Sequence, residues 1–343
     1  MPPPAPGGYD GPGMDDLRQL ISDDSVWADL ERTETLLLEA ATSEDDYLTK
    51  IAQHLLLAGG KRFRPLLALL SARFGPADDD RRLHAGVAVE LIHVGSLYHD
   101  DVIDEADTRR GAPSVNANWS NTVAILAGDF LMARASEVAA THLSQESVRL
   151  LAATYAELVE GQTRELQLQD SLGHSVEAYE RVIAGKTASL IRTSARLGAM
   201  ASDATPSAVE ALSTWAWELG MVFQIVDDAL DLVATEEALG KPAGSDIREG
   251  TFTRAVLEAA RGPDGERVRD LLDRPRPYPD ENVDEVMRLV RDGGYVDRTL
   301  QAAMDRVRVA REALSVLPDS PTREILSSLG DYLVARVDAV RAF

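Results

Sequence analysis

Two groups of aspartates in this sequence share one spacing, Asp-Asp-x-x-Asp. The groups are Asp100, Asp101 and Asp104, and Asp227, Asp228 and Asp231. In an α-helix, residues four apart lie within about 40° of each other on one face. Each group follows an apolar stretch, and carboxylates crowded into apolar surroundings repel one another unless a cation is present. A solvated acidic helix end would explain either group alone, but the repetition favours two cation-binding helix faces.

The ligand types in these groups favour Mg²⁺. The groups offer carboxylate oxygens, and the chain has no cysteine, which excludes disulfides, zinc ribbons, iron–sulfur clusters and thiol nucleophiles. Mg²⁺ commonly takes one or two protein carboxylates per ion and completes its shell with water and phosphate oxygens. Two facing acidic patches therefore predict a diphosphate held between them through several Mg²⁺ ions.

Cations that could bind a diphosphate are concentrated at breaks in the helical pattern. Three of the four lysines directly follow a glycine, namely Lys61, Lys186 and Lys241. Backbone N–H groups and a compact ammonium converge at such junctions, which suits phosphate oxygens. Residues 59–65 contain three cations in one Gly-to-Pro turn, and Arg109 and Arg110 follow the first aspartate group.

Charge and motif spacing exclude other kinds of phosphate-binding protein. The chain has 35 basic and 57 acidic residues and a net charge of −22, so nucleic acid is not an expected partner. The segment Gly185-Lys186-Thr187 resembles the end of a P-loop. However, Glu180 occupies the position of the first P-loop glycine and no strand precedes it.

One other metal-dependent class fits part of the sequence. His99 and Asp100 could belong to a helical metal phosphohydrolase, with further ligands from His54, His84 and His93. That class explains neither the second aspartate group nor the glycine–lysine junctions.

The elements that must position these residues are helices. Apolar residues recur at spacings of three and four, as in Leu48, Ile51 and Leu55, and glycine or proline interrupts the pattern at intervals. Residues 1–13 are rich in proline and glycine and are predicted to be flexible, whereas residues 14–343 are predicted to form a single all-α domain. With no long apolar run and no signal-peptide pattern, we expect a soluble, cytoplasmic protein.

These motifs together resemble the trans-isoprenyl diphosphate synthase, or polyprenyl synthetase, family. The resemblance extends from residues 59–65 to about Gly250 and includes both aspartate groups. Residues 91–111 and 127–129 are similar to the long-chain bacterial members. The family implies an all-α helical bundle around a deep central cavity, usually as a homodimer.

The resemblance also implies roles for individual residues. Lys61, Arg64, His93 and Arg110 resemble the pocket for isopentenyl diphosphate. Arg109, Lys186, Thr187, Gln224 and Lys241 resemble the contacts to the allylic diphosphate, and the resemblance assigns a catalytic role to Lys186, Thr187 and Gln224. Asp100, Asp104 and Asp227 resemble direct Mg²⁺ ligands, supported by Asp101, Asp228 and Asp231. One position departs from the family: Thr251 stands where many members have lysine, so Arg248 or Arg254 would have to supply that contact.

The expected reaction needs no obvious side-chain base. Mg²⁺ and cations stabilise charge on the leaving diphosphate, so the allylic carbon–oxygen bond ionises. The double bond of isopentenyl diphosphate then attacks the carbocation, and the proton leaves to the released pyrophosphate. The carbocation must be kept from water, so we expect a closed apolar cavity. We also consider transient contact with a membrane during product release.

The residues upstream of Asp100 bear on product length. Gly95 and Ser96 lie about 6–7.5 Å below Asp100 along the helix, where short-chain members of the family carry a bulky aromatic. Because Gly95 and Ser96 are small, we expect a long-chain all-trans product, around C35 to C50, of the kind that a respiratory quinone side chain needs. A geranylgeranyl or farnesyl diphosphate synthase is the main alternative, followed by a class I terpene cyclase and a non-catalytic partner subunit.

Overall fold

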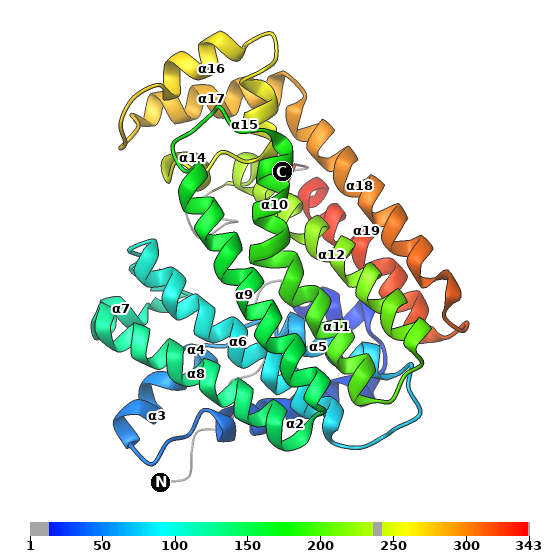
Figure 1. Ribbon diagram of the computed structural model, residues 1–343. Helices are drawn as coiled ribbons and strands as arrows, with labels where there is room; N and C mark the ends of the chain where they lie inside the picture. Colours follow the sequence, from blue (N-terminus) through cyan, green and yellow to red (C-terminus); the bar gives the residue numbers. More distant parts are fainter. Residues whose placement is uncertain (1–13, 236–241, 342–343) are drawn as a thin grey trace. The chain divides into compact units, whose positions relative to one another are not determined.

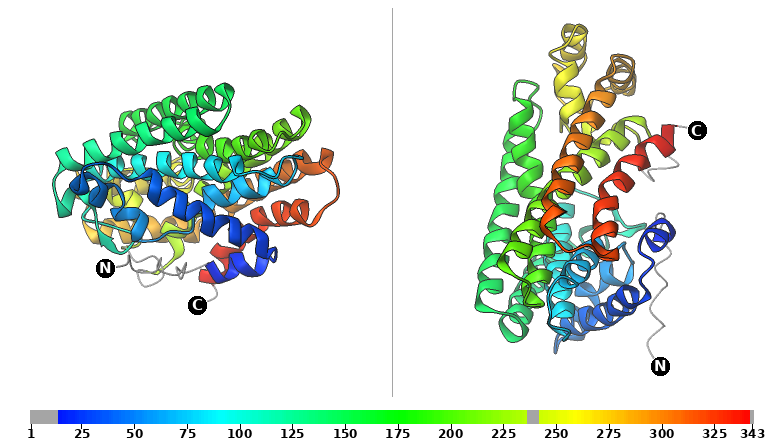
Figure 2. Two further views of the ribbon diagram at one scale, coloured as in Figure 1. Left: turned by 90° about the horizontal axis from the view of Figure 1, so that it is seen from below. Right: turned by 90° about the vertical axis from the view of Figure 1, so that its right-hand side faces the viewer.

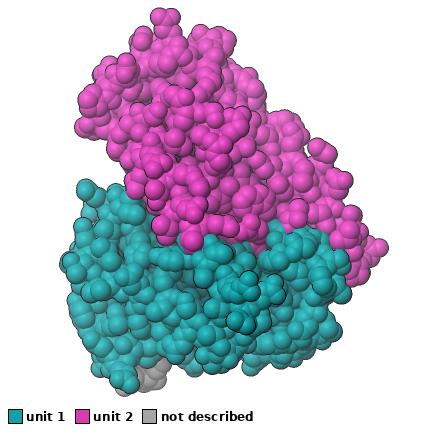
Figure 3. All heavy atoms as spheres, viewed as in Figure 1, with its two compact units in different colours: residues 1–155, 193–213 teal, residues 156–192, 214–343 magenta. Residues whose placement is uncertain are grey.

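The computed structural model describes residues 14–235 and 242–341, which belong to two compact units (Figure 3). Unit 1 is Met1–Tyr155 with Thr193–Ser213, and unit 2 is Ala156–Arg192 with Thr214–Phe343. Each unit combines two separate stretches of sequence, so the division does not follow a linker. A single domain over residues 14–343 stays a prediction, and the predicted flexible segment 1–13 lies outside the described residues.

Unit 1 is a helical assembly with one small hairpin. Its helices are α1 (Met14–Leu20), α2 (Asp24–Ala40), α3 (Asp46–Ala52), α4 (His54–Leu57), α5 (Phe63–Ala72), α6 (Arg81–Ile103), α7 (Val115–Asn118) and α8 (Asn121–His142). The hairpin pairs β1 (Thr108–Arg109) with β2 (Ala112–Pro113). The long helices α9 (Gln145–Leu168), α11 (Ser189–Ala201) and α12 (Pro206–Val233) contribute residues to both units.

Helix α6 is the central element of unit 1. It packs against α2, α5 and α8, as Figures 1 and 2 show. Its residues from Ala85 to Ile92 are buried, including one charged side chain, Glu90. At 1.5 Å per residue its 23 residues span about 35 Å. The helix therefore carries the first aspartate group on a well-packed support.

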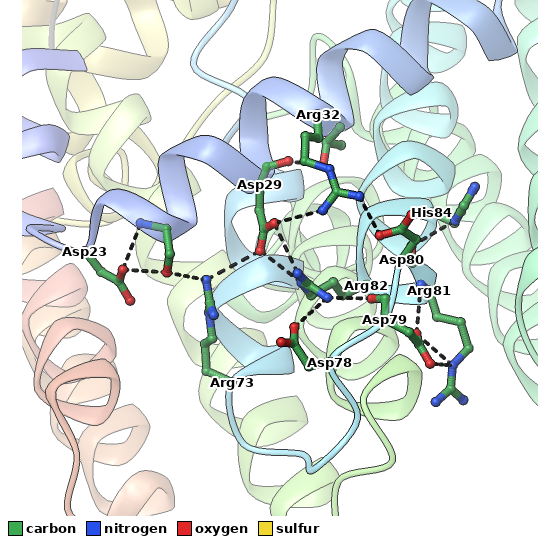
Figure 4. A network of polar contacts seen from close by, with 12 residues as sticks. Asp23, Asp29, Arg32, Arg73, Asp78, Asp79, Asp80, Arg81, Arg82 and His84 are labelled. Carbon is green, nitrogen blue, oxygen red and sulfur yellow. Dashed lines mark hydrogen bonds and ion pairs between the residues drawn. The ribbon is translucent and has the colours of Figure 1, made fainter.

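Salt bridges anchor the beginning of α6 (Figure 4). Asp29 on α2 is 6% exposed and is approached by Arg73 Nη2 at 3.4 Å and by Arg82 Nε at 2.9 Å. A buried carboxylate requires such compensation, because its desolvation costs several kcal/mol, as an order of magnitude. Since Arg82 belongs to α6, this network fixes the end of the helix opposite to the aspartates.

Within the described residues, unit 2 contains the remaining helices. They are α10 (Val176–Ile183), the π-helix η1 (Ala184–Ala188), α14 (Ser245–Arg248), α15 (Arg254–Ala259), α16 (Gly265–Leu272), α17 (Asp280–Asp292), α18 (Tyr295–Ala313), the 3₁₀ turn η2 (Leu314–Val316) and α19 (Pro321–Arg341). Helix α18 packs against α19 and α15, and α16 packs against α17 (Figure 1). Ser175 caps α10 by accepting a hydrogen bond from Ala178 N at 3.2 Å, which places the start of this helix.

The all-α fold predicted from the sequence is confirmed. Within the described ranges the two short strands of the hairpin are the only strands, and none of the described helices combines the length and apolarity needed to cross a membrane. The hairpin itself was not predicted. It turns at Arg110 and Gly111, which both have positive φ, a backbone conformation that favours glycine.

Candidate active site

The first aspartate group lies at the carboxyl end of α6. Asp100 and Asp101 are in the last turn, and Asp104 is the C-cap, whose N–H donates to Asp100 O at 2.8 Å. Asp101 is fully buried, Asp100 is half-buried and Asp104 is exposed. The helical phase inferred from the spacing is therefore correct, and the middle residue differs from the outer two in its environment.

Asp101 is anchored by the hairpin. Its Oδ1 accepts a hydrogen bond from Arg109 Nε at 2.7 Å, and Arg109 Nη2 forms an ion pair with the same oxygen at 2.6 Å. Burial raises the pKa of the Asp101 carboxyl, against the opposing effect of Arg109. Its Oδ2 is also buried and receives no hydrogen bond from the described residues. Arg109, expected to contact the allylic diphosphate, thus also fixes the orientation of an aspartate.

The second group lies near the end of α12. Asp227 is the most accessible of the three and has Arg336 Nη1 3.3 Å from its Oδ1. Asp231 is 1% exposed and its Oδ2 accepts from Asp246 N at 3.1 Å, which ties α12 to α14. The side chains of the group are therefore held by elements that are remote in sequence.

Asp228, the middle residue of the second group, is 6% exposed and is held through both carboxylate oxygens. Gln224 Nε2 donates to Oδ1 at 2.8 Å, and the Tyr179 hydroxyl donates to Oδ2. Burial raises the pKa of Asp228 to about 7. In both groups, then, protein donors hold a buried middle aspartate while the first aspartate is more accessible.

This donor set fits Mg²⁺. The residues are oxygen donors, and Asp101 Oδ2 is a buried acceptor for which the described residues offer no hydrogen bond. No three carboxylate or imidazole side chains within residues 14–235 and 242–341 converge into a complete metal site on their own. A metal that completes its shell with water and phosphate oxygens does not need such a cluster. The assignment of individual ligands stays a prediction.

The Gly-to-Pro turn at residues 59–65 is built around Arg62. This residue is the N-cap of α5 and has a left-handed backbone, with φ 46°. Its Nε and Nη2 each donate to Glu34 at 2.7 Å, and Nη2 also donates to Leu56 O at 2.7 Å. Arg62 is 3% exposed, so this arginine stabilises the turn. A non-glycine residue in this conformation persists only when its surroundings fix it.

Arg64 and Arg110, both predicted for the isopentenyl diphosphate pocket, lie close to buried Glu90. Its Oε1 lies 3.5 Å from Arg62 Nη1 and 3.6 Å from Arg110 Nη2. Burial lowers the pKa of Arg64 to about 10, with Glu90 opposing that change. Burial, followed by Arg64 and Arg110, lowers the pKa of His93 well below its ordinary value. The structure thus brings Arg64, His93 and Arg110 together, with His93 neutral at pH 7.

Glu34→Ala is expected to lower the free energy of unfolding by about 3 kcal/mol, because it leaves the buried Arg62 guanidinium without its bidentate partner. Chemical denaturation measures the change. The matched control is Glu31→Ala, an exposed glutamate on the same helix, for which we expect a change within about 0.5 kcal/mol. Equal effects of the two substitutions would contradict an anchoring role for the Glu34–Arg62 pair.

Lys186 and Thr187 are presented by a π-helix. This segment, η1, passes so close to α9 that a Cβ on Gly161 would lie 2.5 Å from Lys186 N. Lys186 Nζ is paired with Glu165, and the Thr187 hydroxyl donates to Gln224 Oε1 at 2.8 Å. Short π-helices often occur at functional sites because they redirect side chains. Three predicted residues of the allylic half, Lys186, Thr187 and Gln224, are therefore neighbours in unit 2.

The polyprenyl synthetase family model matches residues 45–290, a range that contains both aspartate groups and the cationic turn. This chain belongs to the polyprenyl synthetase family.

Individual relatives cover nearly the whole chain. The nonaprenyl diphosphate synthase of Mycobacterium tuberculosis is 43% identical over 94% of this chain and 96% of its own length. A decaprenyl diphosphate synthase from Rhodobacter capsulatus superposes with a TM-score of 0.86 at 34% identity, covering 94% of this chain and 99% of that one. A polyprenyl synthase from Caulobacter crescentus, complexed with calcium and isoprenyl diphosphate, gives 0.86 at 34% identity, with 94% and 98% covered.

Lys241 and Thr251 are the two remaining positions of this polyprenyl synthetase for which the sequence made a prediction. Lys241, predicted to contact the allylic diphosphate, lies outside the described residues. Near Thr251, both arginines considered as substitutes for the usual lysine are engaged with carboxylates. Arg248 pairs with Asp280, and Arg254 lies 3.1 Å from Glu180. A substrate contact from either arginine would compete with these pairs.

The two residues predicted to set chain length have different surroundings. Gly95 lies against α8, where an added Cβ would be 3.0 Å from Met132 Cε and 3.1 Å from Gly128 O. Gly95 therefore allows the close packing of α6 and α8, and a larger residue there would disturb it. Ser96 is half-buried and donates to His93 O at 2.8 Å. Ser96 is consequently the better position for testing chain length.

Several residues of the site were missed in the sequence. They are Glu34, Glu90, Gly161, Glu165 and Tyr179. Glu90 carried a usable signal, since a carboxylate within a long apolar helical stretch requires buried cations. The others carried none, because their partners are distant in sequence.

Proposed function

We propose that this polyprenyl synthetase is a Mg²⁺-dependent prenyltransferase that condenses isopentenyl diphosphate with an allylic diphosphate. The observation that carries the proposal is the doubled aspartate group, in which protein donors hold a buried middle carboxylate and leave the first carboxylate more accessible. The similar nonaprenyl diphosphate synthase of Mycobacterium tuberculosis and decaprenyl diphosphate synthase of Rhodobacter capsulatus support it.

The residues of the site would have different roles, which follow from their environments. Arg64 and Arg110 would hold the diphosphate of isopentenyl diphosphate, while neutral His93 could add a hydrogen bond but no charge. Lys186 would bind the allylic diphosphate, with Thr187 and Gln224 beside it. Asp100, Asp104 and Asp227 would hold Mg²⁺, which when bound supplies positive charge to the leaving diphosphate. A closed apolar cavity would then keep water from the carbocation.

The experiment is an incubation of the purified protein alone with labelled isopentenyl diphosphate, farnesyl diphosphate and Mg²⁺, with an EDTA-treated sample as control. We expect labelled polyprenyl diphosphate in the first sample and none in the second. Cyclic hydrocarbons without label would indicate a terpene cyclase. Absence of turnover would favour a non-catalytic partner subunit, and hydrolysis of phosphate esters alone would favour the phosphohydrolase alternative.

For the product we propose a long all-trans chain, and Ser96→Phe is expected to shorten it by several isoprene units. The aromatic ring would occupy the level about 6 Å below Asp100, where the wild-type protein has only a hydroxymethyl group. Chromatography of the dephosphorylated products measures the length.

The control for this substitution is Ser328→Phe. Ser328 is likewise a half-buried helical serine that donates to a carbonyl of its own helix, Glu324 O, at 2.9 Å. We expect its product length to be unchanged. A sole C15 or C20 product from the wild-type protein would overturn the long-chain proposal in favour of a short-chain synthase.

A further inference from the structure

Four side chains of unit 2 form a continuous chain of hydrogen bonds. The Tyr179 hydroxyl donates to Asp228 Oδ2, and Gln224 Nε2 donates to Asp228 Oδ1 at 2.8 Å. At the other end, the Thr187 hydroxyl donates to Gln224 Oε1 at 2.8 Å. The residues come from α10, α12 and η1, so the chain connects three separate elements.

The direction of each hydrogen bond follows from the groups available. Asp228 Oδ1 accepts from Gln224 Nε2, so Gln224 turns its NH₂ group toward this carboxyl. The carbonyl of the same amide then faces Thr187 and accepts its hydroxyl proton. This commits the only proton of the Thr187 hydroxyl to Gln224, and its oxygen can serve other partners only as an acceptor.

Tyr179 stands at the far end of this chain and is itself buried. Its exposed fraction is 5%, and that of Asp228 is 6%, so water does not readily replace the tyrosine hydroxyl as a donor. Without this donor, Asp228 Oδ2 would be a buried acceptor free to compete for other protons.

We propose that Tyr179 is a positioning residue that acts through Asp228 and Gln224 to fix Thr187 as a hydrogen-bond acceptor in the allylic half of the site. The proposal rests on the proposed function, since it assigns Thr187 to the allylic half of the site, where an acceptor oxygen would face the positive charge on the allylic carbon and not the diphosphate oxygens, which only accept. The competing explanation is that Tyr179 only fills the core beside α12, in which case it affects stability and nothing else.

A double-mutant cycle separates these two explanations. Tyr179→Phe and Thr187→Val each remove one hydroxyl with little change in volume. We expect Tyr179→Phe to lower kcat about tenfold, with the KM for isopentenyl diphosphate changed less than twofold, as loss of a hydrogen bond to a charged group would predict. In the double variant we expect little loss beyond that of Thr187→Val, because both act through one chain. Additive effects on kcat would overturn the proposal.

The control is Tyr278→Phe. Tyr278 is 6% exposed, belongs to unit 2, and its hydroxyl is also hydrogen-bonded to an aspartate, Asp170. We expect this variant to retain kcat within twofold even if its melting temperature falls as far as that of Tyr179→Phe. An equal loss of kcat in the two variants would overturn the proposal.

Two further measurements cover a Tyr179→Phe variant that does not fold and an enzyme that shows no turnover. Should Tyr179→Phe not fold, Asp228→Asn interrupts the same chain, and the additive or non-additive result with Thr187→Val decides. Calorimetric binding of farnesyl diphosphate with Mg²⁺ to the same proteins needs no turnover. Wild-type binding without turnover would refute the proposed function, while additive weakening of binding in the cycle would refute the role of Tyr179.

Discussion

Asp227→Ala is expected to lower kcat by about a thousandfold while leaving the helical fold intact. Asp227 is the most accessible aspartate of the second group. Its Oδ1 lies 3.3 Å from Arg336 Nη1, and because both side chains are partly exposed, this ion pair contributes little to stability. Removing one of three nearby like charges also relieves repulsion. The loss should therefore appear in the binding of Mg²⁺, whose charge assists departure of the diphosphate. Asp100→Ala, in the first group, is expected to behave in the same way.

Steady-state turnover and circular dichroism of the same samples measure this effect. Asp331→Ala is a suitable control, because Asp331 is an exposed aspartate in unit 2 that forms a salt bridge to Arg311 outside the aspartate groups. We expect it to keep the wild-type kcat. Near-normal turnover of a well-folded Asp227→Ala protein would remove this residue from the set of metal ligands.

Local features of the fold could be predicted because they depend on neighbouring residues. The phase of Asp100 and Asp104 follows from 3.6 residues per turn, and the N–H of Asp104 does donate to Asp100 O. The grouping of Arg64, His93 and Arg110 came from the family resemblance, since residues 46 positions apart in sequence have no spacing rule to relate them (110 − 64 = 46). The structure brings all three together, with Arg64 and Arg110 also close to Glu90.

Contacts that depend on tertiary packing could not be predicted. No periodicity relates Glu34 to Arg62 or Tyr179 to Asp228, because each pair is joined only when separate helices pack together. The π-helix at residues 184–188 depends on Gly161, another remote residue. At Gly95, tertiary packing also decides what the size of the residue alone could not indicate. Its small size suggested space for a growing product, but much of that space is filled by α8.

Arg64→Ala and Lys186→Ala are expected to weaken different substrates. Arg64 lies in unit 1 beside His93 and Arg110, whereas Lys186 lies in unit 2 and is paired with Glu165. Arg64→Ala should raise the KM for isopentenyl diphosphate roughly 10- to 100-fold, the cost of one or two charge-assisted hydrogen bonds. Its effect on the KM for the allylic diphosphate should be several-fold smaller. Lys186→Ala should show the reverse pattern.

The contrast between these two variants is more informative than either alone, because a general loss of structure would raise both constants in both proteins. Lys50→Ala serves as the control, since Lys50 lies over the Trp119 ring at 5.9 Å, outside both cation clusters. We expect its two KM values to be unchanged. Arg64→Lys should recover little, because an ammonium cannot reproduce the planar guanidinium fork. If Arg64→Ala and Lys186→Ala both selectively weaken the same substrate, the division into two diphosphate pockets is wrong, and one pocket must contain both cations.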